Sequence, residues 1–480
     1  MGKILSIAEF SIKKQNISIY FSRVACYDIP VNEFEGRQIM KFAFIGAGSM
    51  TFTRNVVRDL LTFPSFYDAE IALMDIDAFR LEKIKLCCEK INREMETNAT
   101  ITATLDRREA LAGADGVVTT VFNGDIDVWR RDLEIPAKYG VSMNIGDTRS
   151  VSGIFRAARH IPLLLEICKD IEEVCPHAIL LNYTNPMSML CRAMQQNTRV
   201  TVTGLCHSVQ STARRIASWL DIPPSELTYT CLGLNHLAFY RELKYKGKDI
   251  YPLLREKVQS PEIYPQELVR NEMLLRLGYY VTESSGHNSE YNAWFRKRPD
   301  LIDKYCRDHE GSRWNPGEPL YSIDLYAERY RNFADDIETF LKESIDRNAP
   351  RSTEYAAEIF NAMLGDGKPF EFNGNVINEG CVPNLPADAC VEIPVVASRF
   401  GLRKCFVGNV PDEVAPLVNQ TAYLENLATD AIMEKNKTKL IRAVSMDPLT
   451  SAVLSLEEIE AMCHEMFEAN REYLGDWKSV

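Results

Sequence analysis

Residues 41–61 read KFAFIGAGSMTFTRNVVRDLL, and this stretch decides the fold. It opens with a short apolar run at 41–45, of the kind that forms a buried strand. GAGS at 46–49 follows directly, and the residues beyond it carry apolar positions at helical spacing. A strand, a glycine-rich turn and a helix in this order are typical of a dinucleotide-binding unit.

The segments after this unit alternate between strand-like and helix-like patterns. AFRLEKIKLCCEKI at 78–91, for example, has apolar residues at 81, 84, 88 and 91, the spacing of a helix face. Strands that alternate with helices predict parallel βαβ units, so we expect an α/β fold with a Rossmann-type, doubly wound sheet. The expected strands are EIALMDID (70–77), ITATLD (101–106), GVVTTVF (116–122), AILLNYTNP (178–186) and TVTGLCH (201–207).

The pattern changes beyond about residue 226, where ELTYTCLGLNHLAFYRELKY (226–245) alternates like the strands of a mixed sheet. We therefore expect two domains that share one cleft, an NAD-binding domain at 41–226 and a substrate-binding domain at 227–480. Between 123 and 153 we expect a long polar loop. Such a loop is a candidate functional segment, because unstructured connections of that length are uncommon in compact domains.

Residues 1–40 form an N-terminal extension that does not resemble a signal peptide, since it has no sustained apolar region and no small-residue cleavage site. Met40 opens MKFAFIGAGS, and the codons of Glu35, Gly36 and Arg37 can form a purine-rich run like a bacterial ribosome-binding site. We therefore expect translation to start naturally at Met40. A genuine ordered extension is the alternative.

The composition narrows the class of protein. A net charge of −12 over 480 residues argues against a nucleic-acid partner, which would require a basic face. The sequence has no run of about 18 apolar residues, so we expect no membrane-spanning helix. The 13 cysteines include no CxxC pair, and in so long a chain they favour reduced thiols in a cytoplasmic protein.

The glycine-rich turn is expected to hold a dinucleotide through Gly46, Gly48 and Ser49. Glycines let the backbone turn and let a pyrophosphate approach the amides of the helix N-terminus. Asp75 ends the second strand, where its carboxylate would accept from a ribose diol and repel a 2′-phosphate, which favours NAD over NADP. Thr51 stands where the G-x-G-x-x-G fingerprint has its third glycine, so a tight turn that binds no nucleotide stays the alternative.

Polar groups gather at three expected strand ends: NYTNP (182–186), GLCH (204–207) and GLNH (233–236). In a doubly wound sheet, ligands bind beyond the carboxyl ends of the strands, so Cys206, His207 and His236 are expected near the cofactor. A thiolate and an imidazole suit a divalent transition metal, and two protein ligands leave positions for substrate oxygens. The residues alone also allow an alternative without a metal, in which the cysteine packs in the core and His236 is a buried histidine whose ring is hydrogen-bonded within the protein.

Several motifs occur in order along the chain: FAFIGAGS, IALMDID, NYTNPMSM, GLCHSV, GLNHLAFY, TESSGHNSEYNAWF and NLPADACVE. Together they resemble glycoside hydrolase family four, the NAD- and Mn-dependent glycosidases, and within it the bacterial α-galactosidases of the melibiase type. The resemblance covers residues 41–475. It implies a lactate/malate dehydrogenase-like architecture, with a Rossmann domain plus an α+β substrate domain, and a homo-oligomer, dimeric or tetrameric.

The resemblance also implies the reaction, because this family is an exception to the two-carboxylate mechanism of glycosidases. Its members oxidise C3 of the sugar with NAD, remove the C2 proton, eliminate the C1 oxygen, add water and reduce C3 again. We expect hydrolysis of α-hexosides, with α-galactosides as the lead, because CHSV at 206–209 is the variant found with galactosidases. The implied cofactors are NAD and Mn²⁺ or another divalent transition metal.

Residue by residue, the resemblance assigns the metal ligands to Cys206 and His236. Tyr291, in SEYNAWF, matches the base that removes the C2 proton, for which a tyrosine requires a nearby cation. His207 matches the acid that assists departure of the leaving group. Asn185 matches a substrate-contacting asparagine. The alternatives are an aromatic packing role for Tyr291 and a turn role for Asn185.

One loop departs from the family pattern, which usually reads DTxGPGG where this chain has DTRSVSG at 147–153. Serines replace glycines that would permit close approach of the backbone to the substrate, and Arg149 is expected to face an anionic group on it. The substrate alternatives are therefore a uronide, a glucoside or another modified hexoside. A 2-hydroxy acid dehydrogenase and a catalytically silent NAD-binding protein are the alternatives from other classes.

Overall fold

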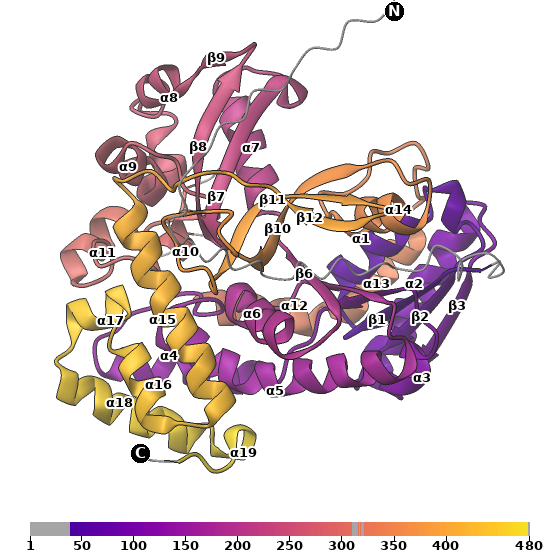
Figure 1. Ribbon diagram of the computed structural model, residues 1–480, viewed down its shortest axis with the longest axis horizontal. Helices are drawn as coiled ribbons and strands as arrows, with labels where there is room; N and C mark the ends of the chain where they lie inside the picture. Colours follow the sequence, from indigo (N-terminus) through magenta and orange to yellow (C-terminus); the bar gives the residue numbers. More distant parts are fainter. Residues whose placement is uncertain (1–38, 310–314, 316, 318–320, 479–480) are drawn as a thin grey trace, which may run out of the picture. The chain divides into compact units, whose positions relative to one another are not determined.

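A computed structural model describes residues 39–478 apart from 310–314, 316 and 318–320. Residues 1–38, and with them nearly all of the expected N-terminal extension, lie outside the described residues. In the described part of the chain, one sheet runs in the order β3-β2-β1-β4-β5-β6-β10-β11-β7-β8-β9, and β12 pairs with β11 (Figure 1).

The first half of this sheet is parallel and has the strand order 3-2-1-4-5-6, which is that of the doubly wound dinucleotide-binding fold. Its strands are β1 (Lys41–Ile45), β2 (Glu70–Met74), β3 (Thr100–Thr104), β4 (Gly116–Thr119), β5 (Ile179–Asn182) and β6 (Thr201–Leu205). The expected α/β class with a Rossmann-type sheet is therefore confirmed.

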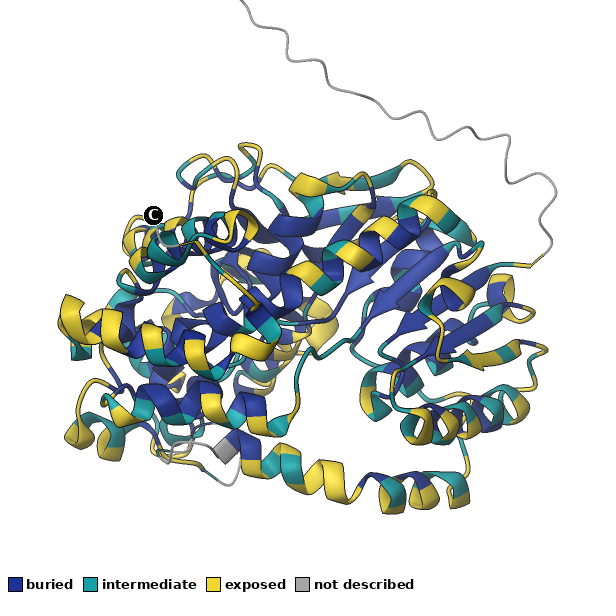
Figure 2. Ribbon diagram, turned by 90° about the horizontal axis from the view of Figure 1, so that it is seen from below, coloured by how far each residue is buried: buried dark blue, intermediate teal, exposed yellow. Residues whose placement is uncertain are grey.

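Helices cover both faces of the parallel sheet because successive side chains of each strand point to opposite sides. Phe42 and Phe44 of β1 pack into one core with α1, α2 and α14, whereas Ala43 and Ile45 pack into the other with α5 and α6. Figure 2 shows the central strands buried and the outer faces of the helices exposed, whereas the edge strand β3 is mostly exposed. The helices of this half are α1 (Met50–Leu60), α2 (Ala78–Glu94), α3 (Arg107–Leu111), α4 (Ile126–Lys138), α5 (Ser150–Val174), α6 (Met187–Asn197) and α7 (Ser208–Trp219).

The second half of the sheet is antiparallel and begins close to residue 226, where the sequence pattern changes. Its strands are β7 (Leu227–Leu234), β8 (Leu237–Tyr245), β9 (Lys248–Asp249), β10 (Phe370–Ile377), β11 (Cys390–Ser398) and β12 (Gly401–Lys404). The hairpin of β10 and β11 inserts between β6 and β7, so that the parallel and antiparallel halves form one continuous sheet. The division into domains at 41–226 and 227–480 stays a prediction.

The remaining helices flank this continuous sheet. They are α8 (Tyr251–Lys257), α9 (Leu268–Leu277), α10 (Ser285–Glu290), α11 (Pro299–Tyr305), α12 (Tyr321–Arg331), α13 (Phe333–Lys342), α14 (Ala356–Leu364), α15 (Ala415–Glu434), α16 (Lys437–Val444), α17 (Pro448–Val453), α18 (Leu456–Ala469) and α19 (Arg471–Leu474). In the described part of the chain, every helix is too short or too polar to cross a membrane.

The expectation of a long polar loop at 123–153 is wrong, because α4 occupies thirteen of its residues. The Asp125 carboxylate caps this helix by accepting from the Val128 N–H. Val128, Trp129 and Leu133 fall at helical spacing and are buried. The aspartates and arginines between them masked this apolar stripe in the sequence.

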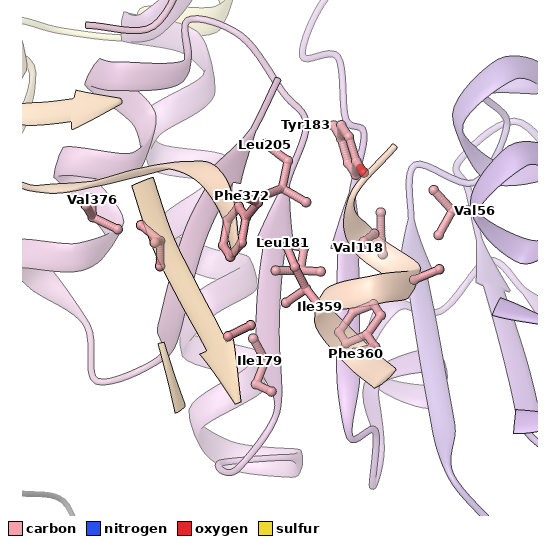
Figure 3. Packing of buried hydrophobic residues seen from close by; sticks show 14 of the residues in the cluster. Val56, Val118, Ile179, Leu181, Tyr183, Leu205, Ile359, Phe360, Phe372 and Val376 are labelled. Carbon is pink, nitrogen blue, oxygen red and sulfur yellow. The ribbon is translucent and has the colours of Figure 1, made fainter. Parts of the chain in front are cut away.

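Helix α14 ties the second half of the chain to the parallel sheet. Figure 3 shows Ile359 and Phe360 of this helix beside Val118 of β4 and Leu181 of β5. The Phe360 ring is fully buried, and it lies so close to Gly116 of β4 that a Cβ there would come within 2.4 Å of the ring. Gly116 is therefore required by the packing of α14 against the sheet.

Replacement of Phe360 by alanine is expected to lower the free energy of unfolding by about 3–5 kcal/mol, because it leaves a cavity between α14 and the sheet. Urea denaturation of the two proteins measures the difference. Phe400→Ala is the matched control: that ring is 80% exposed, so its loss should change stability by no more than about 0.5 kcal/mol. Equal effects of the two substitutions would contradict the role assigned to α14.

Candidate active site

The glycine-rich turn between β1 and α1 has a backbone that only glycine accommodates. Gly46 has φ of +85°, and a Cβ on it would meet the Thr120 carbonyl at 2.7 Å. The Gly48 N–H donates to the Asp75 carboxylate at 2.7 Å, and a Cβ on Gly48 would collide with the same oxygen. The turn and the end of β2 are therefore held together by direct backbone contact.

The groups around this turn fit a dinucleotide. Ser49 precedes the first residue of α1, and its side chain makes no capping hydrogen bond. The N-terminus of this eleven-residue helix can therefore offer its amides to a pyrophosphate. Asp75 Oδ1 accepts from the Asp77 N–H at 2.9 Å, which orients the carboxylate at the end of β2. The structure thus brings Asp75, at the end of β2, against the turn formed by Gly46, Gly48 and Ser49.

Cys206, His236 and Glu283 bring their ligand atoms within 4.8 Å of one another. A thiolate, an imidazole and a carboxylate form a donor set that suits a divalent transition metal. A second set, Asp147, His236 and His287, shares the His236 ring. The residues present therefore fit a metal ion, with His236 at the centre of both arrangements.

Cys206 and His236 lie close together, but they do not follow two parallel strands that end at the same edge of the sheet, as the sequence suggests. Three antiparallel pairings separate β6 from β7, so the two strands run in opposite directions. Cys206 follows the end of β6, whereas His236 lies in the tight turn between β7 and β8. The inserted β10–β11 hairpin and this turn, rather than a common edge of parallel strands, set their separation.

The His236 side chain is held in place on both of its ring nitrogens. Its backbone has φ of +62°, a strained left-handed conformation for a residue other than glycine. Nδ1 lies 3.2 Å from Thr148 Oγ1, and Nε2 lies 3.3 Å from a Glu283 carboxylate oxygen. Burial lowers the pKa of His236 to about 4, so the ring is neutral and keeps the lone pair that a metal ligand needs.

The charges of neighbouring residues favour the Cys206 set over the second set. Burial opposes charge on His287, but the Glu283 and Asp147 carboxylates raise its pKa to about 9. His287 therefore holds a proton more readily than His236 does, which makes it the weaker candidate for a ligand. Burial also opposes charge on Glu283, but the imidazoles around it, among them that of His287, lower its pKa to about 2, which keeps it an anionic ligand.

Sequence reasoning missed Glu283, Asp147 and His287. Glu283 and His287 stand four residues apart in TESSGHN, a spacing at which side chains around a helix turn meet. Asp147 opens DTRSVSG. The sequence drew attention to these two segments because of Tyr291 and Arg149. Their His, Asp and Glu residues would have identified the other three as candidate ligands.

Tyr291 lies against the same centre. Its hydroxyl is 3.4 Å from His236 Nδ1, and the Arg149 guanidinium lies 5.0 Å from the centre of its ring. Burial and the Asp147 carboxylate raise the pKa of Tyr291 well above its usual value, against the opposing effect of Arg149. A tyrosinate at this position therefore requires a further cation beside it.

The other two predicted residues, Asn185 and His207, follow the neighbouring strands β5 and β6 at their carboxyl ends. His207 is about half exposed, and its Nδ1 lies 3.6 Å from the Glu354 carboxylate, which raises the pKa of the histidine. Asn185 follows β5, and its buried Oδ1 has no hydrogen-bond partner within the described residues. His207 can donate a proton to a bound molecule, because its pKa is raised. The unpaired oxygen of Asn185 can accept a hydrogen bond from it.

Arg149 has a protein partner. Its side chain is only 4% exposed and forms an ion pair with Glu425 of α15 at 3.0 Å. Ser150 starts α5 with φ of +60°, and its hydroxyl donates to Asp447 at 2.9 Å. The DTRSVSG segment is thus anchored to the C-terminal helices, and the substrate contact expected of Arg149 stays a prediction.

Arg156, one turn further along α5, differs from the arginines around it. Arg149 and Arg159 each form an ion pair with a carboxylate. Arg156 forms none with any described residue, and its Nε and Nη1 are buried without a hydrogen-bond partner there. Its guanidinium lies over the rings of Phe122, at 4.6 Å, and Trp129, at 5.2 Å. Its guanidinium is in ion-pair contact with no described carboxylate, but it lies close enough to Asp147 to lower the pKa of that carboxyl.

Comparison with known proteins gives two family matches. The model of the family 4 glycosyl hydrolases matches residues 41–222, and that of their C-terminal domain matches 231–450. The chain is similar to an α-galactosidase of Bacillus subtilis (strain 168), with 35% identity over 445 residues that cover 91% of this chain and 100% of the relative. An α-galacturonidase of Thermoanaerobacterium saccharolyticum is 26% identical over 465 residues, 91% of this chain and 97% of the relative.

A solved structure has the same fold. A 6-phospho-α-glucosidase from gut microorganisms, in complex with NAD and Mn²⁺, superimposes with a TM-score of 0.74 at 20% identity. The superposition covers 92% of this chain and 99% of that one. At this level of identity, the likeness is one of architecture.

Two substitutions are expected to separate the two halves of the site. Cys206→Ser should abolish Mn²⁺ binding, measured by electron paramagnetic resonance, while the Kd for NAD⁺ changes less than about twofold, because a hydroxyl is a poor substitute for a thiolate ligand. Gly48→Ala should raise the Kd for NAD⁺ more than about tenfold and leave Mn²⁺ binding intact, because its Cβ displaces Asp75. Each variant is the control for the other, and loss of both ligands in either one would contradict two separate sites.

Proposed function

Because the chain belongs to the family 4 glycosyl hydrolases, we propose that it hydrolyses α-galactosides by an oxidation and elimination route that uses NAD and a divalent metal. The observation that carries the proposal is the contact between Tyr291 and His236. The tyrosine hydroxyl lies 3.4 Å from a ring nitrogen of the residue that shares a donor set with Cys206 and Glu283. A plain 2-hydroxy acid dehydrogenase has no use for such a set.

Each group of the chain has a task in this route. A bound NAD would take up and return a hydride at the sugar, and a bound divalent metal would stabilise negative charge on sugar oxygens. Tyr291 takes the proton from C2 and holds it on its hydroxyl. His207, charged more readily because of Glu354, donates a proton to the leaving oxygen. Asn185 orients the sugar through its unpaired Oδ1.

Similarity to known relatives supports an α-galactoside as the substrate. The relative from Bacillus subtilis that is 35% identical over its whole length is an α-galactosidase. The ion pair between Arg149 and Glu425 gives further support. Glu425 neutralises the positive charge of Arg149, which was expected to attract an anionic sugar, so a neutral galactoside fits better.

Arg156 favours a second candidate, an α-galacturonide. A partly buried guanidinium with no carboxylate in ion-pair contact is costly to hold, and a carboxylate on the substrate would compensate its charge through charged hydrogen bonds. The aromatic rings of Phe122 and Trp129 fix the guanidinium plane, which leaves its edge for such a ligand. Within this proposal, Arg156 takes the role that the sequence assigned to Arg149.

We further propose a cytoplasmic homo-oligomer, dimeric or tetrameric. Each cysteine of the described chain is free, which suits a reducing compartment. The oligomeric state rests on the family resemblance alone.

Turnover in D₂O tests the proposed route. The protein is incubated with p-nitrophenyl α-galactoside, NAD⁺, Mn²⁺ and a thiol reductant, and the released galactose is examined by NMR. We expect deuterium at C2, because the proton removed by the base exchanges with solvent before water adds. Tyr291→Phe should still bind NAD⁺ and Mn²⁺ but lose turnover by at least about 100-fold. Galactose released without deuterium at C2 would refute elimination, and absence of turnover would leave the galacturonide as the candidate.

The role of Arg156 is tested with a matched pair of substrates, p-nitrophenyl α-galactoside and α-galacturonide. Arg156→Gln should lower kcat/KM on the galacturonide by about 10- to 100-fold, the effect of losing a charged hydrogen bond, and on the galactoside by less than about threefold. Arg131→Gln, at an exposed position on α4, makes the same change in charge and should alter neither value. A similar loss on both substrates would contradict recognition of the carboxylate.

A further inference from the structure

Glu392, at the end of the NLPADACVE motif, lies between the two strands that carry the metal-binding residues. The register of the sheet joins four residues in one row: Gly204 of β6, Asn375 of β10, Glu392 of β11 and Gly233 of β7. Gly204 stands two residues before Cys206, and Gly233 stands three before His236. Cross-strand neighbours in such a row share one face of the sheet, so Asn375 and Glu392 lie side by side.

The side chains of this row, and that of Asn235 two residues after Gly233, are buried and incompletely paired. Glu392, Asn375 and Asn235 are each 0% exposed. Within the described residues, five side-chain atoms of this group lack a hydrogen-bond partner. They are both carboxyl oxygens of Glu392, both amide atoms of Asn235, and Asn375 Oδ1. Buried polar groups are seldom left without a partner, because each costs about 1–3 kcal/mol. A group retained at such a cost requires a reason outside the packing of the core.

The row forms a polar connection from one metal-binding residue to the other. Asn375 Nδ2 donates to the Gly204 carbonyl at 3.2 Å, two residues before Cys206. Burial raises the pKa of the Glu392 carboxyl to about 8, and the amide of Asn235, which immediately precedes His236, opposes this shift only in part. Cys206, His236 and Glu283 hold their ligand atoms within 4.8 Å of one another, so the connection ends at the donor set.

We propose that Glu392 is a positioning residue of the metal centre, an outer carboxyl group that holds the Asn235–His236 turn in place beside Cys206. It does not belong to the ligand set itself, which comprises Cys206, His236 and Glu283. The β10–β11 hairpin separates β6 from β7, and through Glu392 it also connects the ends of these two strands. The inference rests on the metal site of the proposed function.

The alternative is a purely structural carboxyl that stabilises the β10–β11 hairpin. The two roles differ in what a substitution changes. A structural role predicts a lower melting temperature with intact metal affinity in the folded protein. A positioning role predicts weaker metal binding at unchanged stability, because outer partners of ligands tune affinity without holding the fold.

The test is titration of the full-length protein with Mn²⁺, followed by the electron paramagnetic resonance signal of the free ion. Glu392→Gln keeps the shape of the side chain and replaces its carboxyl group by an amide. We expect the Kd for Mn²⁺ to rise by about 10- to 100-fold. The Kd for NAD⁺ and the melting temperature should stay unchanged, which separates this effect from general damage.

Glu358→Gln is the matched control. Glu358 is a partly buried carboxyl on α14 whose Oε2 also lacks a partner among the described residues, and it belongs to neither donor set. Its replacement should leave Mn²⁺ binding unchanged. If Glu392→Gln does not fold, Asn235→Ala removes the amide that faces the carboxyl and should weaken Mn²⁺ binding at least about fivefold.

Two results would overturn the inference, and they are distinguishable. A Kd for Mn²⁺ within twofold of the wild-type value in folded Glu392→Gln, or in Asn235→Ala where that variant replaces it, would assign Glu392 to the structure of the hairpin alone. Failure of the wild-type protein to bind Mn²⁺ would instead remove the metal site of the proposed function, and the inference with it.

Discussion

The Glu290 carboxylate is the anchor on which the candidate site depends. It accepts hydrogen bonds from three consecutive backbone N–H groups, those of Asn144, Ile145 and Gly146, at 2.6–2.9 Å. Glu290 is fully buried and ends α10, the short helix that carries His287. A carboxylate that gathers several amides fixes both partners firmly, because such charge-assisted bonds are stronger than neutral ones. One side chain thus joins the segment before α5 to the segment that follows α9.

Most of the site geometry follows from this anchor. Asp147 and Thr148 come directly after the amides held by Glu290, and Thr148 contacts the His236 ring. Tyr291 follows Glu290 in sequence, so its hydroxyl reaches the same ring from the other segment. The strained backbone of His236 is maintained because contacts from both sides determine its position. A local conformation that is costly on its own is therefore held by the tertiary structure.

The parallel half of the fold could be read from the sequence because its signals are local. The apolar run of β1, the glycines at 46 and 48 and the aspartate that ends β2 each act within a few residues of their own position. Helix α4 was missed for a local reason as well, since charged residues surround Val128, Trp129 and Leu133 and hide a narrow apolar stripe. The insertion of β10 and β11 between β6 and β7 could not be read, because strand pairing between distant segments depends on turns and packing elsewhere.

The sequence by itself determined the α/β class, the glycine-rich turn and the family, and it named Cys206, His236 and Tyr291 as residues with chemistry to perform. Only the tertiary structure decided which groups surround them. It added Glu283 to the donor set, paired Arg149 with Glu425, left Arg156 without an acidic partner and set Glu392 between two strands. The physical reason is that charge and coordination depend on distances between atoms of separate elements. Those distances arise only when the sheet closes and the helices pack on it.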